Sequence, residues 1–292
     1  MPLLSVIIVS YNVRSYLEKL LHSAGEALEQ IPSEIIVVDN ASDDESARMV
    51  QETFPDTVLM RNDDNVGFAR ANNRALKRAM GDFIVLLNPD TVVNNETFAS
   101  LLEAFEHFPE AGMVGGKVLN EDGSLQIGCR RSFPTPWVSF TRLIGLSKVF
   151  PGSRIFARYN LTYLDPDTGY ALDAVSGSFM AVRKPVLEDV GYLDERFFLY
   201  GEDLDWCYRI RQSGWKIVYY PKASILHYKG RSSQENNWEH CKHFYDAMLL
   251  FAEKHFKSYN FLTPLWLIKS AILLLSGAAL IRCRIKNLLS TG

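Results

Sequence analysis

Three carboxylates within four positions form the part of this sequence best suited to chemistry. Glu202, Asp203 and Asp205 fall in "GEDLDWCYRIRQSGW", in and near the first turn of a predicted helix. Acidic side chains in that place often only complement the helix dipole. The stretch just upstream, "LDERFFLY", is aromatic and apolar, and such surroundings raise the pKa of a carboxyl toward that of a general base. Three like charges this close together also call for a compensating cation or substrate.

Two further carboxylates end apolar runs. Asp90 closes "DFIVLLNPD" beside Asn88, where it can bind a hard divalent cation that bridges two phosphates, although Asn-Pro-Asp-Thr is equally good turn chemistry. Asp39 closes "EIIVVDN" and can accept a hydrogen bond from a base or a ribose, or cap a helix that begins at Ser42. Because Ser42 is itself a capping residue, the ligand role of Asp39 is favoured.

Single residues elsewhere carry weaker signals. Gly67, just before a predicted helix, would let a phosphate or base approach the backbone amides. Arg70 or Arg74 could pair with a phosphate, although a solvated helix face is the default for both. His227 follows a predicted strand in "ILHYKG", and a lone histidine is more often structural than a ligand.

The elements that must position these residues alternate over the first 120 residues. Continuously apolar runs at 3–11, 34–40, 57–62 and 82–90 predict strands buried on both faces. Amphipathic stretches between them predict helices, with capping boxes at Ser15-x-x-Glu18 and Ser42-x-x-Glu45 and a helix stop at Gly81. This alternation predicts an α/β fold with a doubly wound, mostly parallel, Rossmann-like sheet. Ligands of such sheets bind beyond the carboxyl ends of the strands, which points to Tyr11, Asn12, Asp39, Asn40 and 88–90.

The second half of the chain is less regular at first. "GMVGGKVLNEDGSLQ" predicts a hairpin that turns at Asp122–Gly123. The stretch from Phe133 to Asp167, rich in proline, glycine and aromatic residues, predicts a long excursion that could cover a site. Strands are then expected at "SGSFMAVRK" and "WKIVYYP", and helices from Glu202 to Gln212 and around 238–252.

Composition and the chain ends bear on location. The net charge of −3 gives no general attraction to nucleic acid. Four cysteines without paired spacing indicate thiols in a reducing compartment. The N-terminus has no basic region and an apolar run of only strand length, so we expect no signal peptide and a catalytic body that faces the cytoplasm.

The segment from Phe261 to Ile281 is strongly apolar, interrupted by Pro264, Lys269 and Ser270, and then turns basic at Arg282, Arg284 and Lys286. Its length approaches a membrane span, but its uninterrupted part is shorter. Trp266 and the basic residues suit a cytoplasmic membrane interface. We expect a helix that lies on the bilayer rather than spanning it, with a core or oligomer-interface helix as the alternative.

Seven motifs occur together in one order: "SVIIVSYN", "EIIVVDNASDD", "NVGFARANN", "LLNPDT", "SGSFMAVRK", "FFLYGEDLDWCYRIRQSGW" and "ILHYKG". Over residues 4–256 they resemble the family 2 inverting glycosyltransferases with the GT-A fold. More narrowly, they resemble bacterial rhamnosyltransferase-like members of O-antigen and related cell-surface polysaccharide assembly. The resemblance implies a GT-A domain over 1–256, with a nucleotide-binding half at about 1–120 and an acceptor half at about 121–256, followed by the helix of 257–292.

The same resemblance implies roles on the donor side. Tyr11 and Asp39 would contact the nucleobase and ribose, and Asp90 with Asn88 would be the counterpart of the family's Asp-x-Asp element, binding Mg²⁺ or Mn²⁺ and the diphosphate. Asn88 leaves that element one carboxylate short, and His227 matches a position that supplies a metal ligand in related enzymes. The implied nucleotide-sugar site comprises Ser10, Tyr11, Asn12, Asp39, Asn65, Gly67, Arg70, Asn88, Asp90, Gly177 and Ser178.

On the acceptor side, the resemblance makes Asp203 the general base that deprotonates the acceptor hydroxyl for in-line attack with inversion. Glu202 or Asp205 would hold the acceptor, and Trp206 and the 133–167 excursion would wall it. The implied donor is a nucleotide-diphosphate sugar, dTDP-rhamnose first, with UDP- and GDP-sugars open. The implied acceptor is a lipid-linked saccharide at the cytoplasmic membrane face. The resemblance leaves the oligomeric state open.

Two other functions were weighed against this one. A sugar-phosphate nucleotidyltransferase needs a glycine-rich, basic loop directly after the first strand, and "SYNVRSYLEK" has no glycine. A non-catalytic scaffold could keep the fold and use its C-terminal helix to organise a polysaccharide assembly complex. The presence of Asp39, Asp90, Asp203 and His227 argues against that role.

Overall fold

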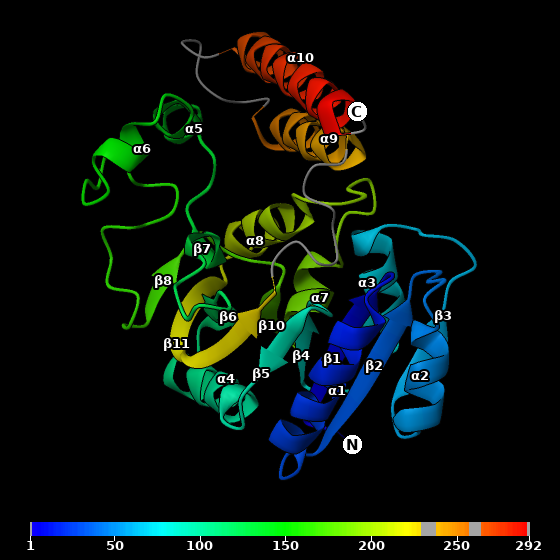
Figure 1. Ribbon diagram of the computed structural model, residues 1–292. Coiled ribbons are helices and arrows are strands. Elements are labelled where there is room, and N and C mark those ends of the chain that lie inside the picture. The colour runs from blue at the N-terminus through cyan, green and yellow to red at the C-terminus, as the bar shows by residue number, and fades with distance from the viewer. Residues whose placement is uncertain (1, 229–237, 257–263, 291–292) are drawn as a thin grey trace.

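A nine-stranded sheet forms the centre of the computed structural model, which describes residues 2–228, 238–256 and 264–290. Its strands are β1 (Leu4–Ser10), β2 (Ser33–Asp39), β3 (Val58–Arg61), β4 (Phe83–Leu87), β5 (Thr91–Val93), β6 (Ala111–Leu119), β8 (Tyr170–Leu172), β10 (Phe179–Arg183) and β11 (Lys216–His227). They follow the order β3-β2-β1-β4-β10-β6-β11-β5, with β8 beside β11 (Figure 1). β1 to β4 pair in parallel, as predicted, whereas β10 runs antiparallel between β4 and β6.

The chain reverses its direction along the sheet after β3. It runs from β1 outward to β3 and returns to the other side of β1 at β4. Right-handed crossovers therefore put α1 (Arg14–Leu28) and α2 (Ser46–Thr53) on one face and α3 (Phe68–Leu76) on the other. The carboxyl ends of β1 and β4 flank this reversal, which is where open sheets of this kind bind ligands.

The apolar faces of the first helices were predicted correctly, but their starts were not. α1 buries Leu17, Leu20, Leu21, Ala24 and Leu28, yet it begins at Arg14, and no side chain of Ser15 caps it. α2 begins at Ser46 instead of Ser42, so both predicted capping boxes are wrong. Asp44 takes over at both helices, because its carboxylate accepts the amides of Arg14 at 2.7 Å and of Ser46 at 3.1 Å. α3 ends at Leu76, before Gly81.

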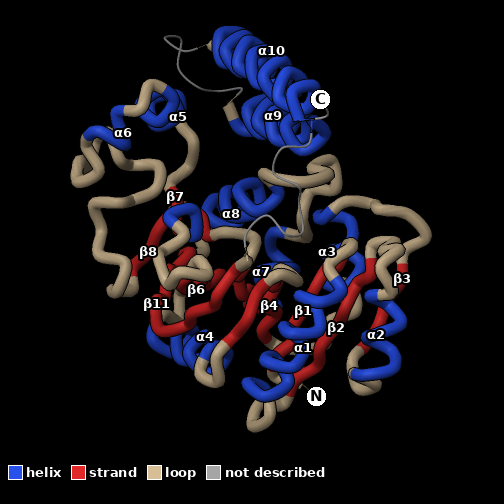
Figure 2. The backbone as a smooth tube through the Cα atoms, in the orientation of Figure 1, coloured by secondary structure: helices blue, strands red, loops and turns tan. Residues whose placement is uncertain are grey.

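The second half keeps most predicted elements and shortens one. α4 (Thr97–His107) leads into β6, and the Asp122–Gly123 turn is present, but only a bridge between Leu119 and Leu125 remains of the hairpin. The 133–167 excursion contains α5 (Pro136–Leu143) and α6 (Leu146–Val149). A 3₁₀ turn (Ile127–Cys129) precedes β7 (Arg130–Arg131), which pairs with β9 (Ala174–Val175). α7 (Lys184–Val190) and α8 (Glu202–Gln212) follow (Figure 2).

Two C-terminal helices complete the structure, α9 (Trp238–His255) and α10 (Leu265–Ser290). Lys269 does not interrupt α10, and its ammonium pairs with Glu253 of α9 at 2.6 Å. The segment Leu265–Arg284 has a mean hydropathy of 1.7, is by length and composition long enough to cross a membrane, and is only 6% buried. It is therefore not a core helix. Positions 229 and 230 of "ILHYKG", positions 261–263 and the side chain of Lys286 lie outside the described residues.

Candidate functional site

The carboxyl ends of β1 and β2 bring Ser10 and Asp39 side by side in the parallel register. Both side chains are buried, and Asp39 Oδ2 accepts the amide of Ser42 at 3.2 Å. Asp39 Oδ1 and Ser10 Oγ have no hydrogen-bond partner among the described residues. A buried polar atom left in this way costs about 1–3 kcal/mol, so this edge is suited to a ligand that supplies the missing partners.

The loops beyond β1, β2 and β3 are held together by amide side chains. Asn40 donates to Asn65 at 2.7 Å and accepts from Asn62 at 2.8 Å. Asn12 Oδ1 accepts the amide of Asp43, so Asn12 is used in fixing a loop. Tyr11 is 41% exposed, which leaves its ring accessible. A hollow of about 440 Å³ opens beside Asn12 and Asp44 at the start of α1.

Gly67 and Arg70 are placed differently from the prediction. Gly67 has a φ of +83°, and a Cβ there would lie 2.6 Å from the carbonyl oxygen of Phe198. The space beside Gly67 is thus filled by Phe198, not left open for a phosphate. The exposed Arg70 side chain pairs with Glu195 at 3.3 Å, which is the solvated helix face considered as the alternative.

The end of β4 and the end of β11 bring Asp90 and His227 together. Asp90 is fully buried, and its Oδ1 lies 3.2 Å from Nε2 of His227. The other ring nitrogen, Nδ1, lies 3.0 Å from Oε1 of Gln126, whose amide donates to the His227 carbonyl. An imidazole oriented through Nδ1 presents Nε2 as metal-binding histidines do.

These two side chains fit a divalent cation only as part of a larger ligand set. A carboxylate oxygen and an imidazole nitrogen are both donors that Mn²⁺ accepts, and Mg²⁺ takes the carboxylate. Within the described residues no group of three or more His, Cys, Asp or Glu side chains could hold a metal. Further ligands would have to come from a bound diphosphate or water.

Asp203 lies at the start of α8 and is held on three sides. Its Oδ2 accepts the Arg131 guanidinium at 2.5 Å and the Gly177 amide at 3.0 Å, and Oδ1 accepts the Leu204 amide at 2.7 Å. A carboxylate has about four lone-pair directions, so one direction on Oδ1 remains for a substrate hydroxyl.

Glu202 beside it is a different kind of carboxyl. It is buried, and its Oε2 has no hydrogen-bond partner among the described residues. Burial, reinforced by the neighbouring charge of Asp203, raises the pKa of Glu202 to about 8. Glu202 is therefore protonated at neutral pH and cannot serve as a base there.

The residues at the end of β4 and those around Asp203 are joined by the turn at 176–178. The amide of Asn88 donates to the carbonyl of Ser178 at 3.1 Å. One residue earlier, the amide of Gly177 donates to Asp203. The predicted metal ligands and the predicted base therefore flank one short turn, although they come from strands and helices far apart in the sequence.

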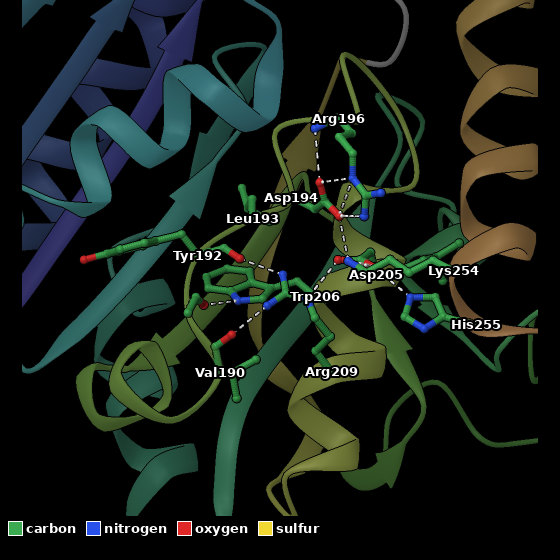
Figure 3. Close-up of polar contacts among 12 residues, drawn as sticks. Val190, Tyr192, Leu193, Asp194, Arg196, Asp205, Trp206, Arg209, Lys254 and His255 are labelled. Carbon is green, nitrogen blue, oxygen red and sulfur yellow. Dashed lines mark hydrogen bonds and ion pairs between the residues drawn. The ribbon is translucent and has the colours of Figure 1, made fainter.

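Asp205 and Trp206 belong to the interior, and their predicted roles at the acceptor are wrong. Trp206 is fully buried, and its Nε1 donates to the Gly191 carbonyl at 2.9 Å. Asp205 is fully buried and paired with Arg209, Lys254 and His255 (Figure 3). Burial alone would raise the pKa of Asp205, but hydrogen bonds from His255 and Lys254 and the charge of Arg209 lower it. This cluster fixes α8 to α9.

Two residues of the site were not predicted from the sequence. Arg131 precedes the long excursion and pairs with Asp203 across 72 positions. Gln126 orients His227 from 101 positions away. No local pattern marks either residue, since only the pairing of β7 with β9 and of β6 with β11 brings them into place.

The family model described as "Glycosyltransferase like family 2" matches residues 2–242. An N-acetylglucosaminyl-diphospho-decaprenol L-rhamnosyltransferase of Mycobacterium tuberculosis is 27% identical over 264 residues, which cover 86% of this chain and 85% of the relative.

Among solved structures, a mannosyltransferase of Pyrobaculum calidifontis in complex with GDP-Man and Mn²⁺ aligns over 100% of this chain and 79% of its own, with a TM-score of 0.59 and 19% identity. TarS of S. aureus in complex with UDP-GlcNAc aligns over 86% of this chain and 65% of its own, with a TM-score of 0.56 and 21% identity. At these identities the two structures support the GT-A fold and nothing finer.

Proposed function

Since this chain belongs to glycosyltransferase family 2, we propose that it moves one sugar from a nucleotide-diphosphate donor to a hydroxyl of a lipid-linked saccharide, with inversion. One observation carries the proposal: the turn at 176–178 connects Asn88, beside Asp90, to Asp203 through two backbone hydrogen bonds. A diphosphate at Asp90 and a hydroxyl at Asp203 would then lie on either side of the sugar. That arrangement suits an in-line displacement.

In the proposed reaction, Oδ1 of Asp203 accepts the proton of the acceptor hydroxyl. The acceptor oxygen forms a bond to the anomeric carbon from the side opposite the diphosphate, and the bond to the diphosphate breaks, so that the leaving oxygen takes the electron pair. Arg131 and the Gly177 amide hold Asp203 in one orientation, which is the positioning that a general base needs.

The donor end of the site follows from the unpartnered edge. Asp39 Oδ1 and Ser10 Oγ would accept and donate hydrogen bonds to the ribose or base, and the exposed Tyr11 ring would stack on the base. Asp90 and His227 would hold Mg²⁺ or Mn²⁺, which when bound would neutralise charge on the departing diphosphate.

The donor and acceptor are proposed from the relatives. The Mycobacterium tuberculosis relative is named for rhamnose transfer to a diphospho-decaprenol acceptor, which supports rhamnose here, with dTDP as the first nucleotide. UDP- and GDP-sugars are the other candidates, since neighbouring structures contain UDP-GlcNAc and GDP-Man. We place α10 on the cytoplasmic face of the membrane. Lys269 of α10 forms an ion pair with Glu253 of α9, and α10 packs against α9. One side of α10 therefore faces protein, and the other side is exposed and could contact lipid.

The proposal is tested by comparing Asp203→Asn with the wild type and with Asp56→Asn, a matched change at an exposed aspartate. Transfer and slow donor hydrolysis with Mn²⁺ should fall by about 10²–10⁴-fold in Asp203→Asn only. Equal turnover by both variants would show that Asp203 is not the base. No turnover by the wild type of any donor that it binds would favour the scaffold alternative.

The donor is identified by thermal-shift measurements with a panel of dTDP-, UDP- and GDP-sugars and Mn²⁺, because only ligands that bind the native state raise Tm. The dTDP-rhamnose shift should be the largest of the panel. A larger shift with a UDP- or GDP-sugar would replace the proposed donor and leave the proposed chemistry intact.

A further inference from the structure

The segment 136–158, which contains α5 and α6, exposes a group of large apolar side chains. They include Trp137 at 50%, Leu143 at 58% and Val149 at 66% exposure. The Trp137 ring lies 6.1 Å from Phe140 and 6.4 Å from Phe156, so the aromatic residues form one patch. Single exposed apolar residues are normal, but a contiguous patch marks a surface that a membrane or another protein covers.

The charge of this segment is one-sided. Residues 136–158 contain Arg142, Lys148, Arg154 and Arg158 and no aspartate or glutamate, in a chain whose net charge is −3. The partner that such a surface fits is apolar at its centre and anionic at its margin. A bilayer that contains anionic lipid has both properties, and Trp and Arg side chains are well suited to its interface.

The position of the segment agrees with that partner. α5 and α6 lie at the same end of the molecule as α10, at the top in Figure 1, and the strands of the sheet lie below all three. α10 also exposes apolar side chains, among them Trp266 at 67% and Leu274 at 76%. One plane of lipid could therefore reach both elements.

We infer that residues 136–158 form a second membrane-docking surface, which inserts apolar side chains into the interface of an anionic bilayer beside α10. A second copy of this chain fits the surface less well. In a symmetric dimer the segment would face itself, and its four cations would be opposed without an acidic partner within it.

Docking here would also set the orientation of the site. Arg131, which holds Asp203, precedes α5 by only five positions. A bilayer in contact with α5 and α6 would bring a lipid-linked hydroxyl to the side of the protein where Asp203 lies. This last step rests on the proposed function, whereas the docking itself does not.

The direct test measures binding of the full chain to extruded phosphatidylcholine vesicles, roughly one-third phosphatidylglycerol, with no donor, metal or saccharide present. Leu143→Asp combined with Val149→Asp should lower the partition coefficient by about tenfold or more. Met80→Asp is the matched control, since Met80 is 52% exposed and precedes β4 at the other end of the strands, and it should bind as the wild type does. Lys148→Glu with Arg154→Glu should weaken binding by about fivefold per residue, and only when anionic lipid is present.

Insertion is read separately from Trp137. Brominated phosphatidylcholine should quench the tryptophan fluorescence of the wild type more than that of Trp137→Phe. Trp215 is the control, because its indole donates to Asp189, and Trp215→Phe should lose no quenching. The inference is overturned if Leu143→Asp/Val149→Asp binds vesicles as the wild type does, or if only Leu274→Asp on α10 reduces binding. The inference is also overturned if Leu143→Asp/Val149→Asp has a lower mass than the wild type in light scattering but binds vesicles equally well. That result would indicate that the surface binds a protein.

Failure of this inference and failure of the proposed function are distinguishable. Loss of vesicle binding at 136–158 with normal transfer to a detergent-dispersed acceptor concerns docking alone. Normal vesicle binding without any sugar transfer would leave the docking surface standing and remove the proposed reaction.

Discussion

Two buried polar regions of the protein differ in how their polar groups are satisfied. At the junction of α8 and α9, Asp205 pairs with Arg209, Lys254 and His255, and Lys254 also pairs with Asp194. At the carboxyl edge of the sheet, by contrast, Ser10 Oγ and Asp39 Oδ1 are buried without a hydrogen-bond partner among the described residues.

The difference separates structure from function more sharply than residue type does. Asp203 and Asp205 stand two positions apart on one helix, and the sequence alone assigned both to substrate. A buried charge whose partners all come from the protein stabilises an interface between elements, whereas a buried polar atom without partners costs free energy that a bound ligand can recover. We therefore expect substitutions at the edge to impair activity and substitutions at the junction to impair folding.

Of the substitutions that contrast the two regions, Asp90→Asn should have the largest effect on activity. The amide keeps the shape of the side chain but removes the buried negative charge, so activity with Mn²⁺ should fall by on the order of a hundredfold or more. The metal-dependent part of the donor-induced rise in Tm should also disappear. Asn88→Asp, which restores an acidic pair, should instead lower the Mn²⁺ concentration needed for half-maximal activity. A normal Mn²⁺ response in Asp90→Asn would remove Asp90 from the metal site.

Asp205→Asn should reverse that pattern. Removing the charge of a fully buried carboxylate leaves Arg209 without its ion-pair partner and Lys254 with Asp194 alone, which should lower the free energy of unfolding by about 3 kcal/mol. The matched control is Glu110→Gln, because the Glu110–Lys216 pair is solvated and its loss should change the free energy of unfolding much less. Denaturant unfolding measures both. If Asp205→Asn lost activity while its stability stayed normal, Asp205 would belong with the substrate site after all.

The comparison also explains what the sequence could predict. The strands of the first half carry their own signal, because a parallel sheet buried on both faces needs continuous apolar runs, and the strand ends then place Asp39 and Asp90 at one edge. The helix predicted from about Glu202 to Gln212 is confirmed as α8. Motif resemblance, and not periodicity, supplied the roles of Asp203 and His227.

What the sequence could not give were contacts between distant segments. Arg131 reaches Asp203 through β7 and β9, and Lys254 reaches Asp205 through the packing of α9, so neither pairing has a local pattern. The motif resemblance placed Trp206 at the acceptor, whereas the structure buries it in the interior. Which face of α8 is buried depends on the elements that pack against it, and those elements come from other parts of the chain.

Glu202 allows the comparison to be tested by pH. In the unfolded chain its pKa is the ordinary 4.5, whereas burial and the charge of Asp203 raise the pKa in the folded protein to about 8. Between these values the folded protein keeps a proton that the unfolded chain releases. The contribution of Glu202 to stability is therefore complete below about pH 4.5 and is lost as the pH rises through about 8. Calorimetry of Glu202→Gln should show a Tm that falls less than that of the wild type across this window. Parallel curves for the two proteins would contradict the buried, protonated state.

The smallest and sharpest contrast pairs two serines of β1. Ser5 and Ser10 are both fully buried, but Ser5 Oγ donates to Glu34 at 2.6 Å and accepts the Gly81 amide at 2.8 Å, whereas Ser10 Oγ has no partner among the described residues. Ser5→Ala should lower the free energy of unfolding by about 1–3 kcal/mol, because it leaves the Gly81 amide unsatisfied. Ser10→Ala removes an unsatisfied hydroxyl, so stability without ligand should stay level or rise, and only the donor-induced shift of Tm should shrink. An equal loss of stability in both variants would mean that Ser10 is a structural residue like Ser5, and that Ser10 does not bind a ligand at the carboxyl edge of the sheet.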